Sequence, residues 1–247
     1  MSLLRRWVLA FVAPRPLVGA VYLPRYLRDW FGFRTAAPAA SRPRLRDSYP
    51  CLTDWSPSTP FDPHYFYQGA WLARHLVARN VPVHVDVGSS VMMLSVMTAW
   101  APTVFVDVRP LHANISGLLP VAGSIGRLPF ADGSVASLSC LHVIEHIGLG
   151  RYGDPLDPDG ATRAAAELRR VLAPGGRLYL STPVGRERVC FNAHRVFAAD
   201  TVCAWFNGFR LEEFACVDDQ GSFNARAAPD DARNLEYGCG MFVFERG

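Results

Sequence analysis

The sequence predicts an α/β protein with a doubly wound, mainly parallel sheet of seven strands that helices cover on both faces. Strand patterns alternate with helix patterns from residue 81 to residue 206, which favours right-handed crossovers between parallel strands. Two strands, residues 209–217 and 237–245, close the chain. A polar loop directly follows the apolar run 135–141, and open parallel sheets place their ligand sites beyond such strand ends.

The composition is that of a globular enzyme. The chain has 247 residues, enough for one large domain, and half of them are hydrophobic. All 25 basic residues are Arg, which excludes mechanisms that need a Schiff-base or phosphate-binding Lys. The six Cys residues form no Cys-x-x-Cys pair, so we expect free thiols in a reducing cytosol and no metal site.

Positive charge gathers at the N-terminus. Residues 1–46 carry nine Arg and one acid, a net charge of +8, and the remainder carries −5. We therefore predict a basic arm with a Pro-rich linker over residues 1–60 and an α/β domain over residues 61–247. A basic arm favours an anionic surface such as phospholipid head groups. Nucleic acid is not expected as a partner, because the chain has no recognition motif for it.

The arm is not predicted to cross a membrane. Its apolar run Trp7–Ala13 ends at Pro14, is shorter than the ~20 residues that span a bilayer, and precedes no clean signal-peptide cleavage site. Aromatic and aliphatic residues interleaved with Arg up to residue 34 suit a segment in the membrane interface. A helical arm that packs on the body or on a second subunit fits equally well. The expected location is the cytoplasm or the inner face of the membrane.

The N-terminal half of the domain is predicted as helix, strand, helix and strand. Asp62 caps a helix that starts at Pro63 and runs to about Arg79. Its aromatic residues either lie over a ligand or belong to the core. The elements that follow are a strand over residues 81–87, a helix over 91–100 and a strand over 103–107.

The turn after strand 81–87 is the first indication of a ligand site. Gly88 can adopt a positive φ angle and let a ligand approach the backbone, and Ser90 can cap the next helix. Asp86 and Asp107 stand at the ends of the two strands, 21 residues apart. Nucleotide-binding α/β folds place an acid at this spacing to bind ribose hydroxyls.

The C-terminal half repeats the alternation. Its elements are strands over residues 118–122, 135–141 and 177–181, helices over 160–172 and 198–206, and a polar insert over 218–234. Pro174-Gly175-Gly176 is expected to stop the first of these helices. The loop after strand 135–141 is dense with groups that donate, accept or carry a proton, namely His142, Glu145, His146, Arg151, Tyr152 and Asp154.

In this order the motifs resemble class I S-adenosylmethionine-dependent methyltransferases. The resemblance covers residues 80–245 and rests on Asp86-Val-Gly88, Asp107, Leu128-Pro-Phe-x-Asp132, His142-Val-Ile-Glu145-His146 and Leu172-Ala-Pro-Gly-Gly176. More narrowly, HVIEHIGLGRYGDPLDPDG, PVGRERVCFNAHRVF and YGCGMFVFER resemble family number 268 among the domains of unknown function. The resemblance implies a Rossmann-like sheet of the methyltransferase type and S-adenosyl-L-methionine as cofactor.

The resemblance also implies a cofactor site. Asp107 would accept both ribose hydroxyls, and His142 would lie beneath the sulfonium. The full implied set is Asp86, Val87, Gly88, Ser89, Asp107, Ser124, Ile125, Leu128 and His142. Ser90 and Met92 stand where a typical member has glycines, so we expect weaker cofactor binding.

The predicted reaction is methyl transfer to a small-molecule or glycan-type acceptor, with envelope polysaccharide metabolism as its setting. An oxygen acceptor needs a base, and the catalytic candidates are His142, His146 and His194, with Glu145 to orient an imidazole. The candidate acceptor-binding residues are Tyr65, Arg151, Tyr152, Arg186, Asn192 and Arg195. For each candidate, a purely structural hydrogen bond or ion pair is the alternative.

Two other functions fit parts of the pattern. The string His142-Val-Ile-Glu145-His146 matches the His-x-x-Glu-His signature of inverted zinc peptidases, in which both histidines share one helix face. The residues before it are predicted as a strand, which disfavours zinc hydrolysis. The other alternative is a catalytically silent binding or scaffold module with the methyltransferase fold.

Overall fold

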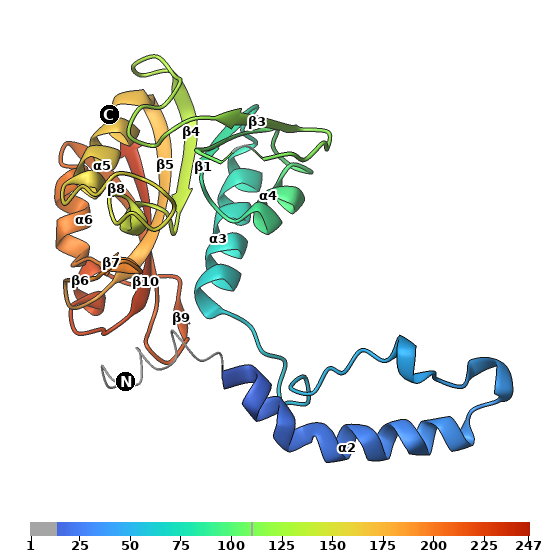
Figure 1. Cartoon of the computed structure of the whole chain (residues 1–247). Helices are drawn as coiled ribbons and strands as arrows, with labels where there is room; N and C mark the ends of the chain where they lie inside the picture. Colours follow the sequence, from blue (N-terminus) through green and yellow to red (C-terminus); the bar gives the residue numbers. More distant parts are fainter. Residues whose placement is uncertain (1–13, 110) are drawn as a thin grey trace. The chain divides into compact units, whose positions relative to one another are not determined.

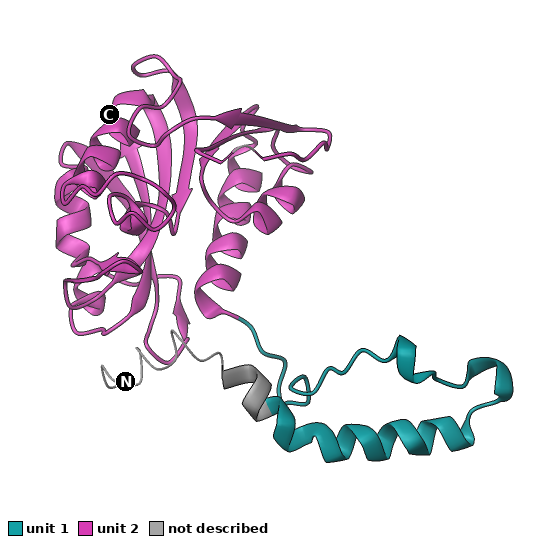
Figure 2. Cartoon of the chain, in the orientation of Figure 1, with its two compact units in different colours: residues 1–61 teal, residues 62–247 magenta. Residues whose placement is uncertain are grey.

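The computed structural model describes residues 14–109 and 111–247. The chain divides into two compact units, residues 1–61 and residues 62–247 (Figure 2). The first unit contains the helix α2 (Pro14–Ala36) and two single turns, η1 (Ala39–Ser41) and η2 (Leu45–Asp47). The predicted apolar run Trp7–Ala13 lies outside the described residues.

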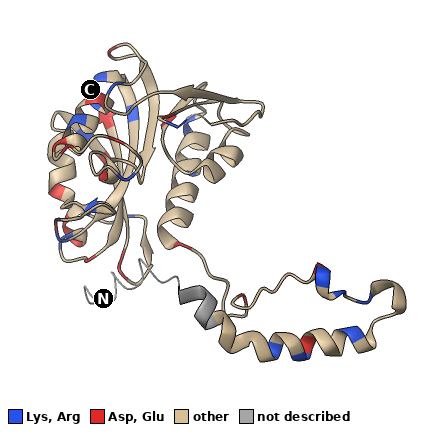
Figure 3. Ribbon diagram, viewed as in Figure 1, with Lys and Arg blue, Asp and Glu red and all other residues tan. Residues whose placement is uncertain are grey.

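Helix α2 exposes apolar and basic side chains together. Val21, Phe31 and Phe33 are exposed, and Arg residues lie along the same helix (Figure 3). The Arg25 guanidinium lies 3.9 Å from the ring centroid of Trp55, which follows later in the same unit. No helix within the described residues is long and apolar enough to cross a membrane.

The second unit is built on one large sheet (Figure 1). Its strand order is β3-β2-β1-β4-β5-β10-β8-β9, with parallel pairing from β3 to β5 and antiparallel pairing of β10 with both of its neighbours. The strands are β1 (His84–Val87), β2 (Thr103–Asp107), β3 (Leu118–Ala122), β4 (Val135–Leu141), β5 (Leu172–Val184), β8 (Phe209–Val217), β9 (Phe223–Asn224) and β10 (Gly238–Arg246). The predicted mainly parallel α/β fold is confirmed, and the two-residue strand β9 adds an eighth member at the edge.

Helices cover both faces of this sheet. Leu141 and Tyr179 pack with Leu72 of α3 (Pro63–Arg79) on one face, where α4 (Val91–Met97) also packs. Leu138 and Leu180 pack with α5 (Gly160–Val171) and α6 (Ala199–Trp205) on the other. Because side chains alternate between the two faces of a strand, neighbouring residues of β4 and β5 enter different cores. The strand ends are the part of the sheet that the helices leave open to ligands.

The two helix caps that the sequence predicts have different outcomes in the structure. The Asp62 side chain accepts hydrogen bonds from the backbone N–H groups of His64 and Tyr65, so the predicted cap of α3 is confirmed. Ser90 occupies the cap position of α4, but its hydroxyl makes no capping hydrogen bond, and the predicted cap is wrong in this respect.

Two features of the C-terminal half differ from the prediction. Strand β5 begins at Leu172, directly after α5 ends at Val171, so Pro174-Gly175-Gly176 belongs to the strand region and does not stop the helix. A hairpin of β6 (Arg188–Cys190) and β7 (His194–Val196) follows β5, in residues where no strand is predicted. The hairpin brings the loop of residues 191–193 towards the site described next.

Candidate active site

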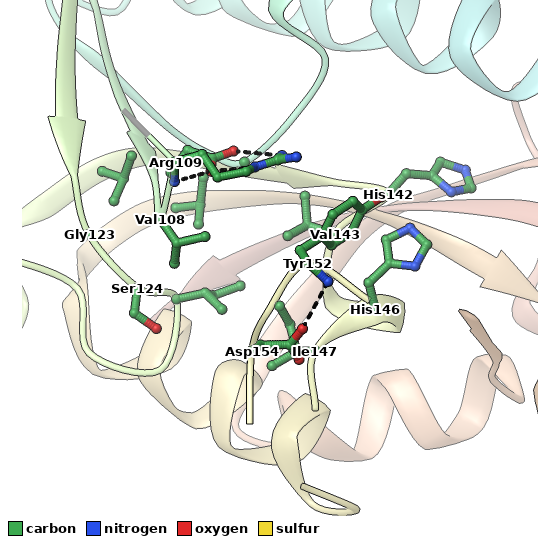
Figure 4. Close-up of a pocket in the computed structure, with 15 residues that line it drawn as sticks. Val108, Arg109, Gly123, Ser124, His142, Val143, His146, Ile147, Tyr152 and Asp154 are labelled. Carbon is green, nitrogen blue, oxygen red and sulfur yellow. Dashed lines mark hydrogen bonds and ion pairs between the residues drawn. The ribbon is translucent and has the colours of Figure 1, made fainter. Parts of the chain in front are cut away.

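Two cavities open beyond the carboxyl ends of the parallel strands, where this class of fold binds ligands. The first encloses ≈ 710 Å³, part of which is open to solvent. Figure 4 shows His142 and His146 at one end of it and Ser124 at the other. It is lined by Val87, Gly88, Val106, Asp107, Val108, Arg109, Gly123, Ser124, Ile125, His142, Val143, His146, Ile147, Tyr152 and Asp154.

Gly88 forms the tight turn at the end of β1. Its φ angle is +68°, in the left-handed region that favours glycine, and its N–H donates to the carbonyl of Val106. A Cβ atom at this position would lie 3.2 Å from Cγ1 of Val143. Glycine at this position therefore allows both the left-handed turn and the close packing of Val143, and Gly88 itself lines the cavity.

Asp107 is one of the two acids that line the first cavity, with Asp154. Its side chain is 12% exposed, and its carboxylate accepts a 2.7 Å hydrogen bond from the backbone N–H of Arg109. The Arg109 guanidinium donates to the same carboxylate from Nε at 3.3 Å and lies 4.7 Å from the ring centroid of Tyr152. Two carboxylate oxygens offer about four lone-pair directions, so acceptor capacity remains for a ligand.

Asp86 lies behind this cavity and not in its wall. Its side chain is fully buried, and it accepts hydrogen bonds from the Ser89 N–H and the Ser139 hydroxyl. The Ser139 oxygen in turn lies 2.8 Å from Nε2 of the buried His84. Burial raises the pKa of Asp86 from 3.8 to about 6, although the bonds from Ser139 and Ser89 lower it. Asp86 therefore holds the turn rather than the ligand.

The pKa of Asp86 predicts a pH-dependent stability. A folded-state pKa above the unfolded value gives a contribution that is full below about pH 4 and is lost as the pH rises through about 6. We expect the free energy of unfolding of the wild type to fall relative to Asp86→Asn by ~2–3 kcal/mol between about pH 4 and pH 7. Urea denaturation of both proteins across this range measures the difference, and a difference that does not change with pH would contradict the assignment.

The second cavity adjoins the first and shares His142, His146 and Tyr152 with it. Its volume is ≈ 1080 Å³. It is lined by Asp62, Pro63, His64, Tyr65, His142, Glu145, His146, Arg151, Tyr152, Ala193, His194, Asp218, Asp219, Gly221 and Tyr237. Four histidines and three tyrosines make this cavity aromatic, polar and rich in groups that titrate.

His142 stands where the two cavities meet. Its backbone has φ +54°, and its ring stacks on Tyr65 and on His64 with centroid distances of 5.5 and 5.3 Å. Its Nδ1 lies 2.7 Å from Oε1 of Glu145, and its Nε2 lies 3.3 Å from Sγ of Cys239. Burial lowers the pKa of His142, but Cys239 and Glu145 outweigh burial and raise it well above 6.5.

Glu145 fixes the orientation of His142. Its side chain is fully buried, and burial alone would raise its pKa, but the charge and the hydrogen bond of His142 lower it below 4.5. The hydroxyl of Thr182 donates to its second oxygen at 3.5 Å. An ionised carboxylate beside a protonated imidazole is the state that these contacts favour.

The pKa of His146 is shifted in the opposite direction from that of His142. Burial is the largest influence on it and lowers its pKa below 6.5. Its Nδ1 lies 2.7 Å from the carbonyl oxygen of Ala193, which only a protonated Nδ1 can bond, so the neutral ring carries its lone pair on Nε2. The Arg151 guanidinium donates to the same carbonyl at 2.9 Å. The ring of His194 is tilted by 45° against that of Tyr237 at a centroid distance of 4.9 Å, and burial lowers the pKa of His194 as well.

Some of the residues that the resemblance implies for cofactor binding line the first cavity, and others do not. The first cavity is lined by Val87, Gly88, Asp107, Ser124, Ile125 and His142. Asp86, Ser89 and Leu128 do not line it, and their contact with the cofactor stays a prediction. The Ser89 hydroxyl accepts from the Leu141 N–H inside the sheet, and Leu128 is buried in the core with its N–H bonded to Glu167.

Only some of the candidate acceptor-binding residues line the second cavity. Tyr65, Arg151 and Tyr152 line the second cavity, as do all four catalytic candidates. The other three, Arg186, Asn192 and Arg195, do not line it, and their role as acceptor residues stays a prediction. Arg186 pairs with Glu236 at 3.1 Å, Asn192 is exposed, and Arg195 donates to the carbonyls of Ile147, Asp157 and Pro158.

Several lining residues have no counterpart in the prediction. Among them are Arg109 in the first cavity and His64, Asp218, Asp219 and Tyr237 in the second. His64 lies next to the aromatic residues that start α3, which is the signal that the sequence offered for it. Asp218, Asp219 and Tyr237 come from the ends of β8 and β10, which reach the site because β10 pairs with β5 and β8 pairs with β10.

The geometry of inverted zinc peptidases is not present at the His-x-x-Glu-His string. His142 has a left-handed backbone directly after β4, and Ile144–His146 form a single 3-10 turn. His142 and His146 therefore do not stand one turn apart on an α-helix, which their joint binding of zinc requires.

The family model described as "Caenorhabditis protein of unknown function, DUF268" matches residues 131–231 of the chain. The predicted resemblance to this family is confirmed. The matched segment contains β4, the His142–His146 loop and the β6–β7 hairpin, which together supply much of the second cavity. No curated protein is significantly similar to the chain.

Solved structures confirm the class I methyltransferase-like fold. The N-methyltransferase NodS from Bradyrhizobium japonicum is 16% identical, with a TM-score of 0.53 over 75% of this chain and 97% of NodS. A 1,6-didemethyltoxoflavin-N1-methyltransferase from Burkholderia thailandensis, with 1,6-didemethyltoxoflavin and S-adenosylhomocysteine bound, is 15% identical, with a TM-score of 0.51 over 74% of this chain and 79% of that one. The [4+2]-cyclase SpnF is 14% identical, with a TM-score of 0.52 over 74% and 81%. At such identities the similarity shows the fold.

Proposed function

We propose that the protein transfers a methyl group from S-adenosyl-L-methionine to a small-molecule or glycan-type acceptor. The observation that carries the proposal is the pair of cavities that meet at His142 and His146. One cavity has the features of a nucleoside site, and the other is rich in polar and titrating side chains. A transfer reaction needs this arrangement, because donor and acceptor must approach each other with their reacting atoms aligned.

The first cavity fits the cofactor. Gly88 lines the cavity where the methionine portion would lie, and the Asp107 carboxylate can accept the ribose hydroxyls. Val108, Ile125 and Ile147 supply apolar surface for a planar base. The bound cofactor supplies an electrophilic methyl group. The residues of the chain supply orientation and exclude water, which can account for much of the acceleration of an in-line displacement.

His146 is the residue that best fits a general base. Its lowered pKa keeps it neutral near pH 7, and its Nδ1–H is held by the Ala193 carbonyl, which leaves Nε2 to accept a proton. The pKa of His142 is raised instead, because Glu145 and Cys239 favour its protonated form. We therefore assign proton removal from a hydroxyl acceptor to His146 and orientation to His142.

The second cavity supports a polyhydroxylated acceptor. Tyr65, Tyr152 and Tyr237 offer flat apolar faces, and Arg151, Asp218 and Asp219 offer hydrogen-bonding groups around them. Sugars present both kinds of surface, since their C–H faces pack on aromatic rings and their hydroxyls bond to charged groups. Envelope polysaccharide metabolism on the cytoplasmic side of the membrane is the setting that we propose for such an acceptor.

Isothermal titration calorimetry with S-adenosylmethionine and S-adenosylhomocysteine tests the proposal. We expect saturable binding of both with one site per chain. Absence of binding at millimolar concentration would contradict the cofactor assignment. Binding without transfer to any tested glycan would favour a catalytically silent module, an alternative that has support in the ion pair of Arg109 with the predicted ribose acceptor Asp107.

For the first unit we propose contact with an anionic membrane surface. Helix α2 exposes Val21, Phe31 and Phe33 alongside its Arg residues, which is the composition of an interfacial helix. We expect the full chain to sediment with phosphatidylglycerol vesicles at low salt and to be released as salt rises, because salt screens the Arg charges. Equal vesicle binding after deletion of residues 1–34, or equal binding to phosphatidylcholine, would contradict this proposal.

A further inference from the structure

Three side chains from separate parts of the chain converge beside the second cavity: His64 in the first turn of α3, His142 after β4, and Cys239 in β10. One nitrogen of each imidazole and the sulfur of Cys239 all lie within 4.8 Å of one another. Among the residues that the structure describes, they form a group with the donor set of a transition-metal site.

We propose that His64, His142 and Cys239 bind one zinc ion, whose fourth position faces the second cavity. This site is distinct from the His-x-x-Glu-His pattern, because it uses His142 but neither Glu145 nor His146 as a ligand. Three protein ligands and one open position are the arrangement of catalytic zinc, whereas structural zinc is closed by four.

The distances suit zinc. Tetrahedral zinc with Zn–N bonds of ~2.0–2.1 Å and a Zn–S bond of ~2.3 Å holds its ligand atoms roughly 3.4–3.6 Å apart. Nε2 of His142 and Sγ of Cys239 are already 3.3 Å apart. The remaining separations are at most 4.8 Å, about 1 Å more than tetrahedral zinc requires, and His64 is the only one of the three ligands that is not buried.

Glu145 supplies the support that a metal-binding histidine needs. Its carboxylate bonds Nδ1 of His142 at 2.7 Å, and zinc takes the place of the proton that Nε2, the nitrogen that faces Cys239, carries in the metal-free pair. A carboxylate that bonds the second nitrogen of a ligand histidine fixes the tautomer and makes the ligand more basic. Support of a metal-binding His142 would explain why Glu145, an acid, is completely buried.

The ligands stand on rigid elements. Cys239 is fully buried in β10, where it pairs with Pro183 on one side and with Val217 on the other. His64 is held by the Asp62 cap of α3, and His142 by the end of β4. One thiolate and two imidazoles favour zinc over magnesium or calcium, which prefer oxygen ligands.

The site deepens the proposed function and rests on it for its role in the reaction. His64, His142 and Tyr237 line the second cavity, so an acceptor there reaches the open position of the ion. A hydroxyl or thiol of the acceptor that binds zinc loses its proton more readily and becomes a better nucleophile. The proton leaves to His146 or to solvent. Binding of the metal itself does not depend on methyl transfer.

Metal analysis tests the site in the full chain, produced without a polyhistidine tag. We expect about one zinc per chain by inductively coupled plasma mass spectrometry after dialysis against zinc chloride and removal of excess metal. His64→Ala and Cys239→Ser should each lose stoichiometric zinc. Two matched controls should retain it: His146→Ala, a histidine of the same cavity, and Cys216→Ser, a buried cysteine on the neighbouring strand β8.

Cobalt substitution identifies the ligand directly. The Co²⁺-loaded wild type and Cys216→Ser should show thiolate-to-cobalt charge-transfer absorption, and Cys239→Ser should not. If Cys239→Ser fails to give a native circular dichroism spectrum, His64→Ala, whose side chain is only partly buried, decides the question. Loss of zinc in His146→Ala with retention in His64→Ala would overturn the proposal, as would a wild type that takes up no zinc. Zinc binding without binding of S-adenosylmethionine would leave this site intact and contradict the proposed methyl transfer.

Discussion

Replacement of Glu145 by Ala is expected to lower the free energy of unfolding by ~3–5 kcal/mol, because it leaves the buried His142 without its carboxylate partner. Both side chains are almost completely buried, and their contact is 2.7 Å. Removal of one member of a buried pair strands the charge of the other, which costs more than the pair itself contributes. Chemical denaturation at pH 7 in a buffer with a chelator measures the effect without a contribution from metal.

Glu236→Ala is the matched control for this prediction. Glu236 pairs with Arg186 at 3.1 Å, but both side chains are about two-thirds exposed. Exposed ion pairs contribute little, so we expect no measurable change in the free energy of unfolding. If both substitutions changed the free energy of unfolding by a similar, small amount, Glu145 would not form a stabilising buried ion pair with His142.

Asp107→Ala is expected to weaken binding of S-adenosylmethionine about 10- to 150-fold, which corresponds to the ~1.5–3 kcal/mol of hydrogen bonds to a charged group. The carboxylate ends β2 in the wall of the first cavity and is the acid at the ribose-binding position. Calorimetry with the cofactor measures the dissociation constants of wild type and variant. The fold should be unaffected, because Asp107 lies at a strand end and contacts the exposed Arg109.

Asp230→Ala controls for the loss of one negative charge. Asp230 is an exposed acid that pairs with Arg233 and lies in neither cavity. Its replacement should leave cofactor affinity unchanged. If wild type and Asp107→Ala bound S-adenosylmethionine with equal affinity, Asp107 would not bind the ribose hydroxyls. The first cavity would then lack its main chemical feature of a nucleoside site.

The sequence predicted the sheet well because its evidence was local. The bounds of β2, β3, β4 and β8 are the predicted ones, since each is a short run of β-forming residues between turn signals. The β6–β7 hairpin was not predicted, because its six strand residues include two Arg and one His and have no apolar alternation. Tertiary contacts, and not the local pattern, stabilise such short strands.

The candidate site was predicted only in part, for a geometric reason. A motif identifies which residues stand at a strand end, but not which way each side chain points. Asp86 and Asp107 do end neighbouring parallel strands, yet one carboxylate is sealed by Ser139 and Ser89 while the other reaches the cavity. Ser89 and Leu128 likewise turn inward, and the sequence offers no sign of this.

The sequence by itself determined the order of strands and helices, the strand ends that carry Asp107 and His142, and the tight turn at Gly88, because these follow from local periodicity and turn chemistry. The tertiary structure alone decided that His64, Tyr237 and Cys239 meet His142 beside a second cavity. Those residues come from α3 and β10, far apart along the chain, and they are brought together because β10 inserts between β5 and β8 and α3 packs across the sheet.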